Sequence, residues 1–254
     1  MTFFSTSKLL EIGEIPFISH VEKPTRKEAL EYYRRLQQSY HIEINLYEEV
    51  QKMERLPSEN YQISTSKGIY QTPSVIVATG FYDTPRLLNV PGEKLPKVKH
   101  YYDDAHPYIG QKLLIVGAAN SACDVALEAW NKGAEVTMAI RKDEIYPKVK
   151  YWIRPNIENR IKEGSITAND FVLAMTGYKP NYTLLENLGL DIPDDEARIP
   201  IHDPETLETS LPGVYLAGVV CAGMRTSKLF IENTRDHGDV IIEHIQKRAV
   251  STAV

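Results

Sequence analysis

The sequence predicts an α/β protein built on buried parallel strands. Short apolar runs at residues 74–80, 113–117 and 212–218 each end in a turn of small residues, as buried strands of parallel sheets do. The run at 113–117 leads directly into a helical pattern, and another apolar run follows at 136–140. Together these segments make a β-turn-α-β unit, and 254 residues are enough for one large or two small domains.

The helix after Val116 has one apolar face and a glycine at each end. Gly117 permits the tight turn that leaves the strand, and Gly133 stands where a helix C-terminal glycine is expected. The apolar face follows the i, i+3, i+4, i+7, i+8 spacing and consists of Ala122, Val125, Ala126, Ala129 and Trp130.

The turn that opens this helix predicts a nucleotide site. In a β-turn-α-β unit the first turn directs backbone N–H groups and the positive end of the helix dipole toward a bound diphosphate. The G-x-G-x-x-G/A fingerprint is partly kept, with Gly117, Ala119 and Ala122 at its three positions. Alanine fits the third position, but at the second its Cβ points into the space that a phosphate needs. In this context the pattern favours nucleotide binding over a purely structural crossover.

The end of the second strand indicates which nucleotide binds. An NAD site places Asp or Glu there, whereas this strand runs into Arg141 and Lys142, two cations that suit a 2′-phosphate. NADPH is therefore the predicted coenzyme. Asp143 and Glu144 follow at once, so two readings remain open: an NAD-type acidic residue reached by a loop shift, and a plain surface charge cluster.

Composition and charge exclude several classes of protein. The chain is 43% hydrophobic and 25% charged, with a net charge of -5 and a pI near 5.8, which argues against nucleic acid or anionic membrane as the main partner. No apolar run approaches the length of a membrane span, and the first residues lack a signal-peptide pattern. We expect a cytoplasmic protein.

The two cysteines carry little redox signal of their own. Cys123 and Cys221 are far apart and form no C-x-x-C pair, which excludes a local dithiol and, by spacing, a metal cluster. Cys123 lies at the start of the fingerprint helix, where the dipole could lower its pKa, but its apolar neighbours favour a packed residue. No metal site is expected.

The remaining elements flank these strands. Residues 1–24 show no clean period and are expected to be irregular. Thr25 and Glu28 have capping-box spacing and predict a helix to about Ser39, with a buried side formed by Ala29, Leu30, Tyr33, Leu36 and Tyr40. Strands are expected at 41–47, 50–56 and 61–65, and helices at about 156–162 and 229–246.

The order of these motifs resembles that of flavoprotein reductases with two dinucleotide sites, and in particular the bacillithiol disulfide reductase family. A meander precedes an A-T-G strand, a P-G-E turn, the nucleotide unit, a second T-G strand, a P-G-V-Y-x-A-G strand and a terminal helix. The specific runs are Thr2–Ser5, Leu10–Gly13, Ala78–Asp83, Leu95–Val98, Trp152–Ile153, Ala174–Tyr178 and Phe230–Asn233.

The resemblance implies an enzyme that carries FAD and uses NADPH to reduce a low-molecular-weight disulfide. It implies two Rossmann-like three-layer domains: an FAD-type domain over 1–105 that returns over 181–254, and an NADPH-binding domain over 106–180. It implies that Arg141 and Lys142 hold the 2′-phosphate of NADPH. The diphosphate site would be Gly117, Ala118, Ala119, Asn120, Ser121 and Ala122, and the flavin site would be bordered by Thr79, Gly80, Gly218 and Val219. Thr176 and Gly177, in the second T-G turn, are further expected cofactor-binding residues.

Two departures from that family pattern stand out. The family begins with an FAD-binding strand and fingerprint, whereas this chain starts at a later point, so the first domain is expected to be incomplete and no catalytic residue is assigned. The second domain also lacks its own meander where Ala168 meets Asn169. Residues missing from the sequence as given would explain both departures, and so would a truncated relative that has lost FAD. Cys221 is a conceivable flavin-adjacent thiol.

Two other functions remain open at this point. One is a flavin-containing monooxygenase on the same architecture, in which reduced flavin meets oxygen. The other is a non-catalytic protein that binds NADPH or senses redox state. Relatives of this type are usually homo-oligomers, and we expect the same here.

Overall fold

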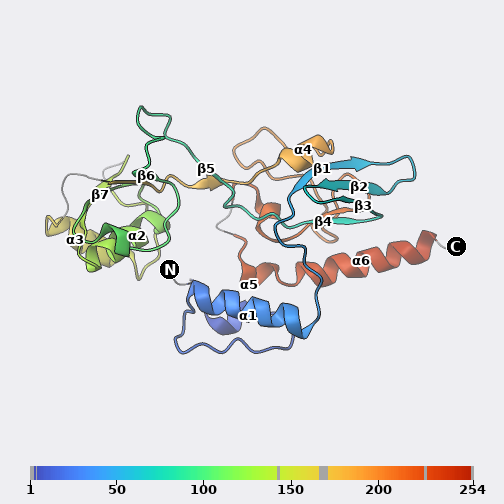
Figure 1. Ribbon diagram of the computed structural model, residues 1–254, viewed down its shortest axis with the longest axis horizontal. Coiled ribbons are helices and arrows are strands. Elements are labelled where there is room, and N and C mark those ends of the chain that lie inside the picture. Colours follow the sequence, from blue (N-terminus) through green and yellow to red (C-terminus); the bar gives the residue numbers. More distant parts are fainter. Residues whose placement is uncertain (1–2, 4, 142–143, 166–170, 226–227, 253–254) are drawn as a thin grey trace. The chain divides into compact units, whose positions relative to one another are not determined.

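The computed structural model describes residues 3, 5–141, 144–165, 171–225 and 228–252 (Figure 1). The chain forms two compact units. Met1–Thr84 and Lys179–Val254 make the discontinuous unit, and Pro85–Tyr178 make the inserted unit. Strands β5 (Thr84–Pro85) and β10 (Tyr178–Lys179) pair where the chain passes from one unit to the other.

The inserted unit is a parallel sheet with helices in the connections between its strands. Its strand order is β6-β9-β7-β8, and each neighbouring pair is parallel. The strands are β6 (Val98–Lys99), β7 (Lys112–Val116), β8 (Glu135–Ala139) and β9 (Phe171–Ala174), with η2 (His106–Tyr108), α2 (Asn120–Asn131) and α3 (Arg154–Lys162). The predicted β-turn-α-β unit is therefore β7, α2 and β8.

The core of the inserted unit lies between the sheet and α2. Leu113 and Ile115 of β7 are fully buried against the helix face that the sequence predicts. Of that face Ala122, Val125, Ala126 and Ala129 are buried, Trp130 is partly buried, and Cys123 joins them. Helix α3 begins at Arg154, two residues before the expected start, because Pro155 is well placed in the first turn of a helix.

The discontinuous unit contains a parallel strand pair and a separate antiparallel meander. Strand β4 (Val75–Val77) pairs in parallel with β11 (Val214–Leu216). The meander has the order β1-β2-β3, formed by β1 (Val50–Arg55), β2 (Tyr61–Thr65) and β3 (Ile69–Thr72). The helices of the discontinuous unit are η1 (Ser7–Leu10), α1 (Arg26–Ser39), α4 (Thr183–Asn187), η3 (Gly218–Ala222), α5 (Ile231–Thr234) and α6 (His237–Thr252).

Helix α1 has the predicted cap but a different buried face. Thr25 and Glu28 form the capping box. The buried residues are Ala29, Tyr32 and Leu36, so the expected burial of Leu30 and Tyr40, which are 54% and 51% exposed, was wrong. The N-terminal segment, which is irregular as expected except for the short helix η1, selects the face. The ring centroids of Tyr32 and Phe17 are 4.4 Å apart, and the Tyr32 hydroxyl donates to the Ile15 carbonyl at 2.8 Å.

Two other element predictions were wrong. Residues 41–47 form no strand, and Ile42, Ile44 and Leu46 are exposed. Positive φ angles at His41 (+51°) and Tyr47 (+55°) interrupt the extended backbone at both ends. The final helix is divided into α5 and α6 and ends later than expected; the Thr234 hydroxyl donates to the Phe230 carbonyl at 2.8 Å and competes with the helical ladder.

The boundaries of the units differ from the expected ones. The inserted unit spans 85–178, whereas the sequence suggests 106–180. Residues 85–105 belong to it because β6 pairs with β9, with Val98 opposite Val172. The expected junction between Ala168 and Asn169 lies outside the described residues.

Candidate dinucleotide-binding sites

The predicted nucleotide residues of the inserted unit come together at the carboxyl edge of its sheet. Val116 of β7 pairs with Ala139 of β8 on one side and with Ala174 of β9 on the other. The turns after these three strands contain Gly117, Arg141 and Thr176, so they start from the same edge. In open parallel sheets this edge is where ligands bind. Lys142, the second predicted cation, lies outside the described residues.

Gly117 is required by the geometry of the turn. Its φ is +137°, and its N–H donates to the Ala139 carbonyl at 3.0 Å. A Cβ at this position would lie 2.6 Å from the Met175 carbonyl oxygen and 3.2 Å from the Ala122 Cβ. Only glycine fits this position, as expected for the first glycine of the fingerprint, which makes the tight turn.

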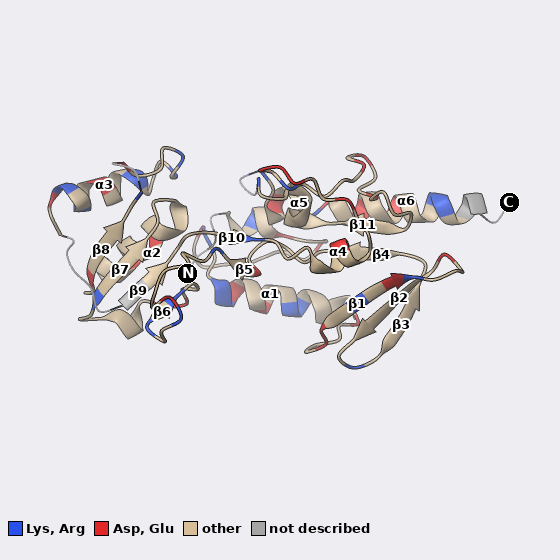
Figure 2. Ribbon diagram, turned by 90° about the horizontal axis from the view of Figure 1, so that it is seen from above, with Lys and Arg blue, Asp and Glu red and all other residues tan. Residues whose placement is uncertain are grey.

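The N-terminus of α2 offers backbone donors without a side-chain cap. Its N-cap residue is Ala119, which makes no capping hydrogen bond, and the first helical bond runs from Cys123 N–H to the Ala119 carbonyl at 3.0 Å. The amides of Asn120, Ser121 and Ala122 therefore lack intrahelical acceptors. Figure 2 shows acidic but no basic residues on α2, so the positive end of this helix is due to its dipole. These donors fit the diphosphate of a dinucleotide.

A segment that sequence reasoning missed packs beside this N-terminus. The Tyr146 N–H donates to the Ala118 carbonyl at 3.1 Å, and the Lys150 N–H donates to Asn120 Oδ1 at 2.9 Å. The signal was available, because Ile145, Val149 and Ile153 repeat every four residues and are buried in the core of the unit.

Thr176 and Gly177 are held by the backbone next to β5. The Thr176 hydroxyl donates to the Arg86 carbonyl, and the Arg86 N–H donates to the Gly177 carbonyl at 2.9 Å. This T-G turn is thus attached to the segment that enters the inserted unit. Arg141 is exposed at the end of its strand.

A second carboxyl edge occurs in the discontinuous unit. Val77 of β4 lies opposite Leu216 of β11, so Thr79 and Gly80 follow one strand while Gly218 and Val219 follow its neighbour. Gly80 and Gly218 both have a φ of +79°, and a Cβ on either would meet nothing within 4 Å. Open space in front of two adjacent turns at a carboxyl edge fits a ligand that approaches the backbone closely, as the resemblance implies for FAD.

The environment of the cysteines disfavours thiolates. Burial raises the pKa of Cys123 to about 12, which supports the packing interpretation. Burial also raises the pKa of Cys221 to about 11, although its Sγ lies 3.9 Å from His237 Nδ1. His237 Nδ1 accepts the Gly218 N–H at 3.2 Å, so this histidine holds the turn that follows β11. Burial lowers the pKa of His237, which favours the neutral, accepting ring.

The parts of the chain that the structure describes offer neither a metal centre nor a membrane span. Within them no group of three His, Cys, Asp or Glu residues could hold a metal ion. No helix within the same ranges is long and apolar enough to cross a bilayer.

The fold and these two edges define an oxidoreductase of the class that binds two dinucleotides. The family model described as pyridine nucleotide-disulphide oxidoreductase matches residues 1–169 and 162–218. The chain belongs to this family.

The similar proteins point to one branch of it. The chain is 40% identical to the bacilliredoxin reductase Bdr of Bacillus subtilis over 97% of its own length and 84% of that protein. Solved structures of bacillithiol disulfide reductase Bdr (YpdA) from Bacillus cereus and Staphylococcus aureus both align with a TM-score of 0.92. Their identities are 37% and 35%, over 97% and 98% of this chain and 85% of each of those chains. These likenesses favour a disulfide reductase over the monooxygenase and non-catalytic alternatives.

Proposed function

We propose that this protein reduces the disulfide of a low-molecular-weight thiol, of the bacillithiol disulfide kind, with NADPH as reductant and FAD as carrier. The observation that carries the proposal is the gathering of Gly117, Arg141 and the uncapped α2 N-terminus at one sheet edge, in a chain 40% identical to a bacilliredoxin reductase. When bound, the two cofactors supply hydride transfer from nicotinamide to flavin and electrons for the disulfide.

In this proposal the chain binds and orients the coenzymes. The amides of residues 117–122 hold the NADPH diphosphate, and Arg141 with Lys142 holds the 2′-phosphate. The flavin would be bordered by Thr79, Gly80, Gly218 and Val219, and Thr176 with Gly177 are further proposed cofactor-binding residues of the inserted unit. The residue that exchanges electrons with the substrate disulfide is unassigned.

The proposal extends to the setting of the enzyme. We infer that it works in the cytoplasm as a homo-oligomer on a small-molecule substrate, without nucleic acid. The net charge of -5 supports the last point, because polyanions repel an acidic protein.

The first experiment compares coenzymes and charge reversals. Arg141→Glu should weaken NADPH binding at least tenfold in a fluorescence titration and leave NADH binding within about twofold, because only NADPH carries the 2′-phosphate. Lys132→Glu, which makes the same charge change at the other end of α2, is the control and should bind NADPH like wild type. Equal NADPH affinities for wild type and Arg141→Glu would contradict the assignment.

The second experiment tests the reaction. The visible spectrum of the purified protein reports flavin, and NADPH consumption should depend on added bacillithiol disulfide. Consumption driven by oxygen through a long-lived oxygenated flavin, with no response to the disulfide, would instead favour the monooxygenase alternative.

A further inference from the structure

Residues 145–153, here called the strap, cross beside the N-terminus of α2. One side of the strap is anchored in the core of the inserted unit, because Ile145, Val149 and Ile153 are 3%, 5% and 4% exposed and pack in the same cluster as α2. Two tight turns shape it, with Val149 N–H donating to the Tyr146 carbonyl and Ile153 N–H to the Lys150 carbonyl, each at 2.9 Å. The strap therefore has a defined position in this unit.

The strap is bonded to the fingerprint turn at two points. Tyr146 N–H donates to the carbonyl of Ala118, and Lys150 N–H donates to the side-chain oxygen of Asn120. Asn120 is the first residue of α2. The second bond is 2.9 Å long, an ordinary amide hydrogen bond.

This bond orients the Asn120 amide. An asparagine side chain has one accepting oxygen and one nitrogen with two donor hydrogens. Because the oxygen receives the Lys150 N–H, a flipped amide would set donor against donor. The amide nitrogen keeps both hydrogens, and in the described part of the chain it has no acceptor.

The fingerprint turn lacks one of its usual close backbone contacts to a diphosphate, and a side-chain donor could replace it. Ala119 replaces the second glycine, the position at which the backbone normally approaches the diphosphate most closely. A methyl group there keeps phosphate oxygens farther from the backbone N–H groups. A side-chain amide at the next residue reaches farther than a backbone N–H and can restore a hydrogen bond across that gap.

We propose that the Asn120 side-chain NH2 group donates to the diphosphate of the pyridine nucleotide, and that the strap, through the Lys150 backbone N–H, is the positioning element that turns this amide toward the coenzyme. This inference rests on the proposed function, because it adds a side-chain donor and a second chain segment to the same site. Asn120 is the coenzyme-contacting residue, and Lys150 acts through it.

The variant Asn120→Asp distinguishes a direct contact between the Asn120 amide and the coenzyme from a purely structural role of this residue. The aspartate keeps an oxygen for the Lys150 N–H, and a negative charge in the first turn of a helix is favourable, so the protein should fold with an unchanged or higher melting temperature. It replaces the donor with a negative acceptor. Calorimetric titration with NADP+ should show at least tenfold weaker binding than wild type, whereas a purely structural role for Asn120 predicts equal binding.

Two comparisons isolate the hydrogen bond from simple charge repulsion. Asn131→Asp makes the same change at the other end of α2 and should bind NADP+ like wild type. The ratio of the Asn120→Asp and wild-type dissociation constants should also persist at 0.5 M salt, where exposed charges are strongly screened. A ratio that falls to about one at high salt would overturn the proposal.

A measurement on the wild-type chain does not depend on the variant. The Asn120 side-chain NH2 pair, assigned by triple-resonance NMR, should move downfield when NADP+ is added and stay in place with adenosine, which lacks the diphosphate. No movement on saturation would overturn the inference alone. Absence of any NADP+ binding by wild type would instead contradict the proposed function.

Discussion

Gly117 bonds the turn after β7 to the end of the neighbouring strand β8, because its N–H donates to the Ala139 carbonyl. Its φ of +137° suits glycine alone, and a Cβ added at this position would lie only 2.6 Å from the Met175 carbonyl oxygen. Gly110 makes a matched comparison, since its φ is +71° but nothing lies within 4 Å of a Cβ. Both belong to the inserted unit.

Gly117→Ala should therefore destabilise the protein by about 2 kcal/mol or more, through backbone strain together with the close contact. Gly110→Ala should lower the free energy of unfolding by only about 1 kcal/mol, because the alanine would be strained by the left-handed backbone but would make no close contact. Urea unfolding measures both values. A Gly117→Ala variant as stable as Gly110→Ala would show that Met175 can move away.

The two thiols are predicted to be slow nucleophiles. Because burial raises the pKa of Cys123 to about 12 and of Cys221 to about 11, little thiolate exists at pH 8. Labelling by an aromatic disulfide reagent should be at least a hundredfold slower than for free cysteine, and both thiols should react rapidly once the chain is unfolded in urea. Fast labelling of the native protein at one site would identify a reactive thiol there.

At the scale of elements, the cap of α1 makes part of the stability depend on pH. The Thr25 N–H donates to Glu28 at 2.7 Å and the Thr25 hydroxyl also donates to it at 2.7 Å, which lowers the pKa of Glu28 to about 2. A carboxyl whose pKa falls on folding stabilises the native state above its unfolded value of about 4.5. This stabilisation disappears as the pH falls from about 4.5 toward 2.

Wild type should accordingly lose more stability between pH 6 and pH 3 than Glu28→Gln, which has no charge to lose. Thr25→Ala should cost about 1 kcal/mol at pH 7, as the loss of a helix cap does. Urea unfolding at the two pH values measures both effects. If wild type and Glu28→Gln lose equal stability on acidification, the capping box is not the source.

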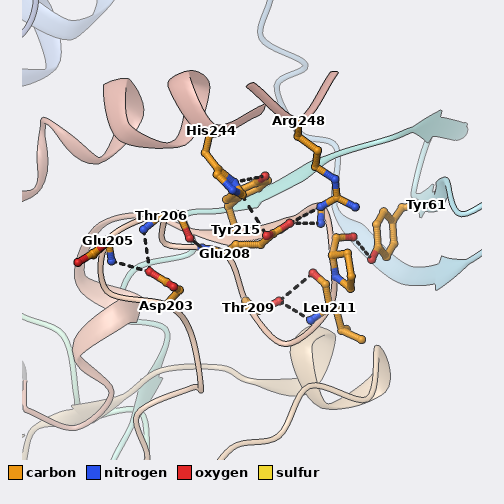
Figure 3. A network of polar contacts seen from close by, with 12 residues as sticks. Tyr61, Asp203, Glu205, Thr206, Glu208, Thr209, Leu211, Tyr215, His244 and Arg248 are labelled. Carbon is orange, nitrogen blue, oxygen red and sulfur yellow. Dashed lines mark hydrogen bonds and ion pairs between the residues drawn. The ribbon is translucent and has the colours of Figure 1, made fainter. Parts of the chain in front are cut away.

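Helix α6 is tied to β11 by a polar network (Figure 3). The Tyr215 hydroxyl and His244 Nδ1 share a hydrogen bond of 2.9 Å, and Arg248 pairs with Glu208. Glu208 also accepts the Gly213 N–H at 2.6 Å, so one carboxylate joins the helix to the turn before the strand. The buried Tyr61 hydroxyl donates to the Pro212 carbonyl at 2.8 Å in the same turn.

Removing that carboxylate should release both contacts. Glu208→Ala is expected to cost about 2 kcal/mol, the usual range for hydrogen bonds to a charged group. Glu208→Gln keeps an acceptor for the Gly213 N–H and should cost less than about 1 kcal/mol. Chemical denaturation of the two variants checks the order, and an equal loss would mean that the Arg248 ion pair alone carries the effect.

At the scale of the whole molecule, the coenzyme should stabilise the two units unequally. NADP+ at a hundredfold excess over its dissociation constant stabilises the native state by about 2.7 kcal/mol. Because the proposed contacts lie in Pro85–Tyr178, hydrogen exchange should slow at residues 117–123 and 145–153, with little change in the meander strands β1–β3. Uniform protection of both units would contradict the assignment of the coenzyme to the inserted unit.

Local signals in the sequence determined the parts of this protein that depend on near neighbours. The β7-α2-β8 unit, its apolar helix face, Gly117 and the Thr25 cap all follow from residues within a few positions of one another, and the structure confirms them. The dinucleotide class also follows, because the motifs of that class are local.

Only the tertiary structure decided what depends on distant partners. The face that α1 buries is set by Tyr32 meeting Phe17, and residues 41–47 alternate like a strand but form none. The 145–153 strap reaches Asn120 from thirty positions away. The physical reason is the same in each case: periodicity states which side of a segment is apolar, but the energy of burial or of a hydrogen bond is realised only where another part of the chain supplies the partner.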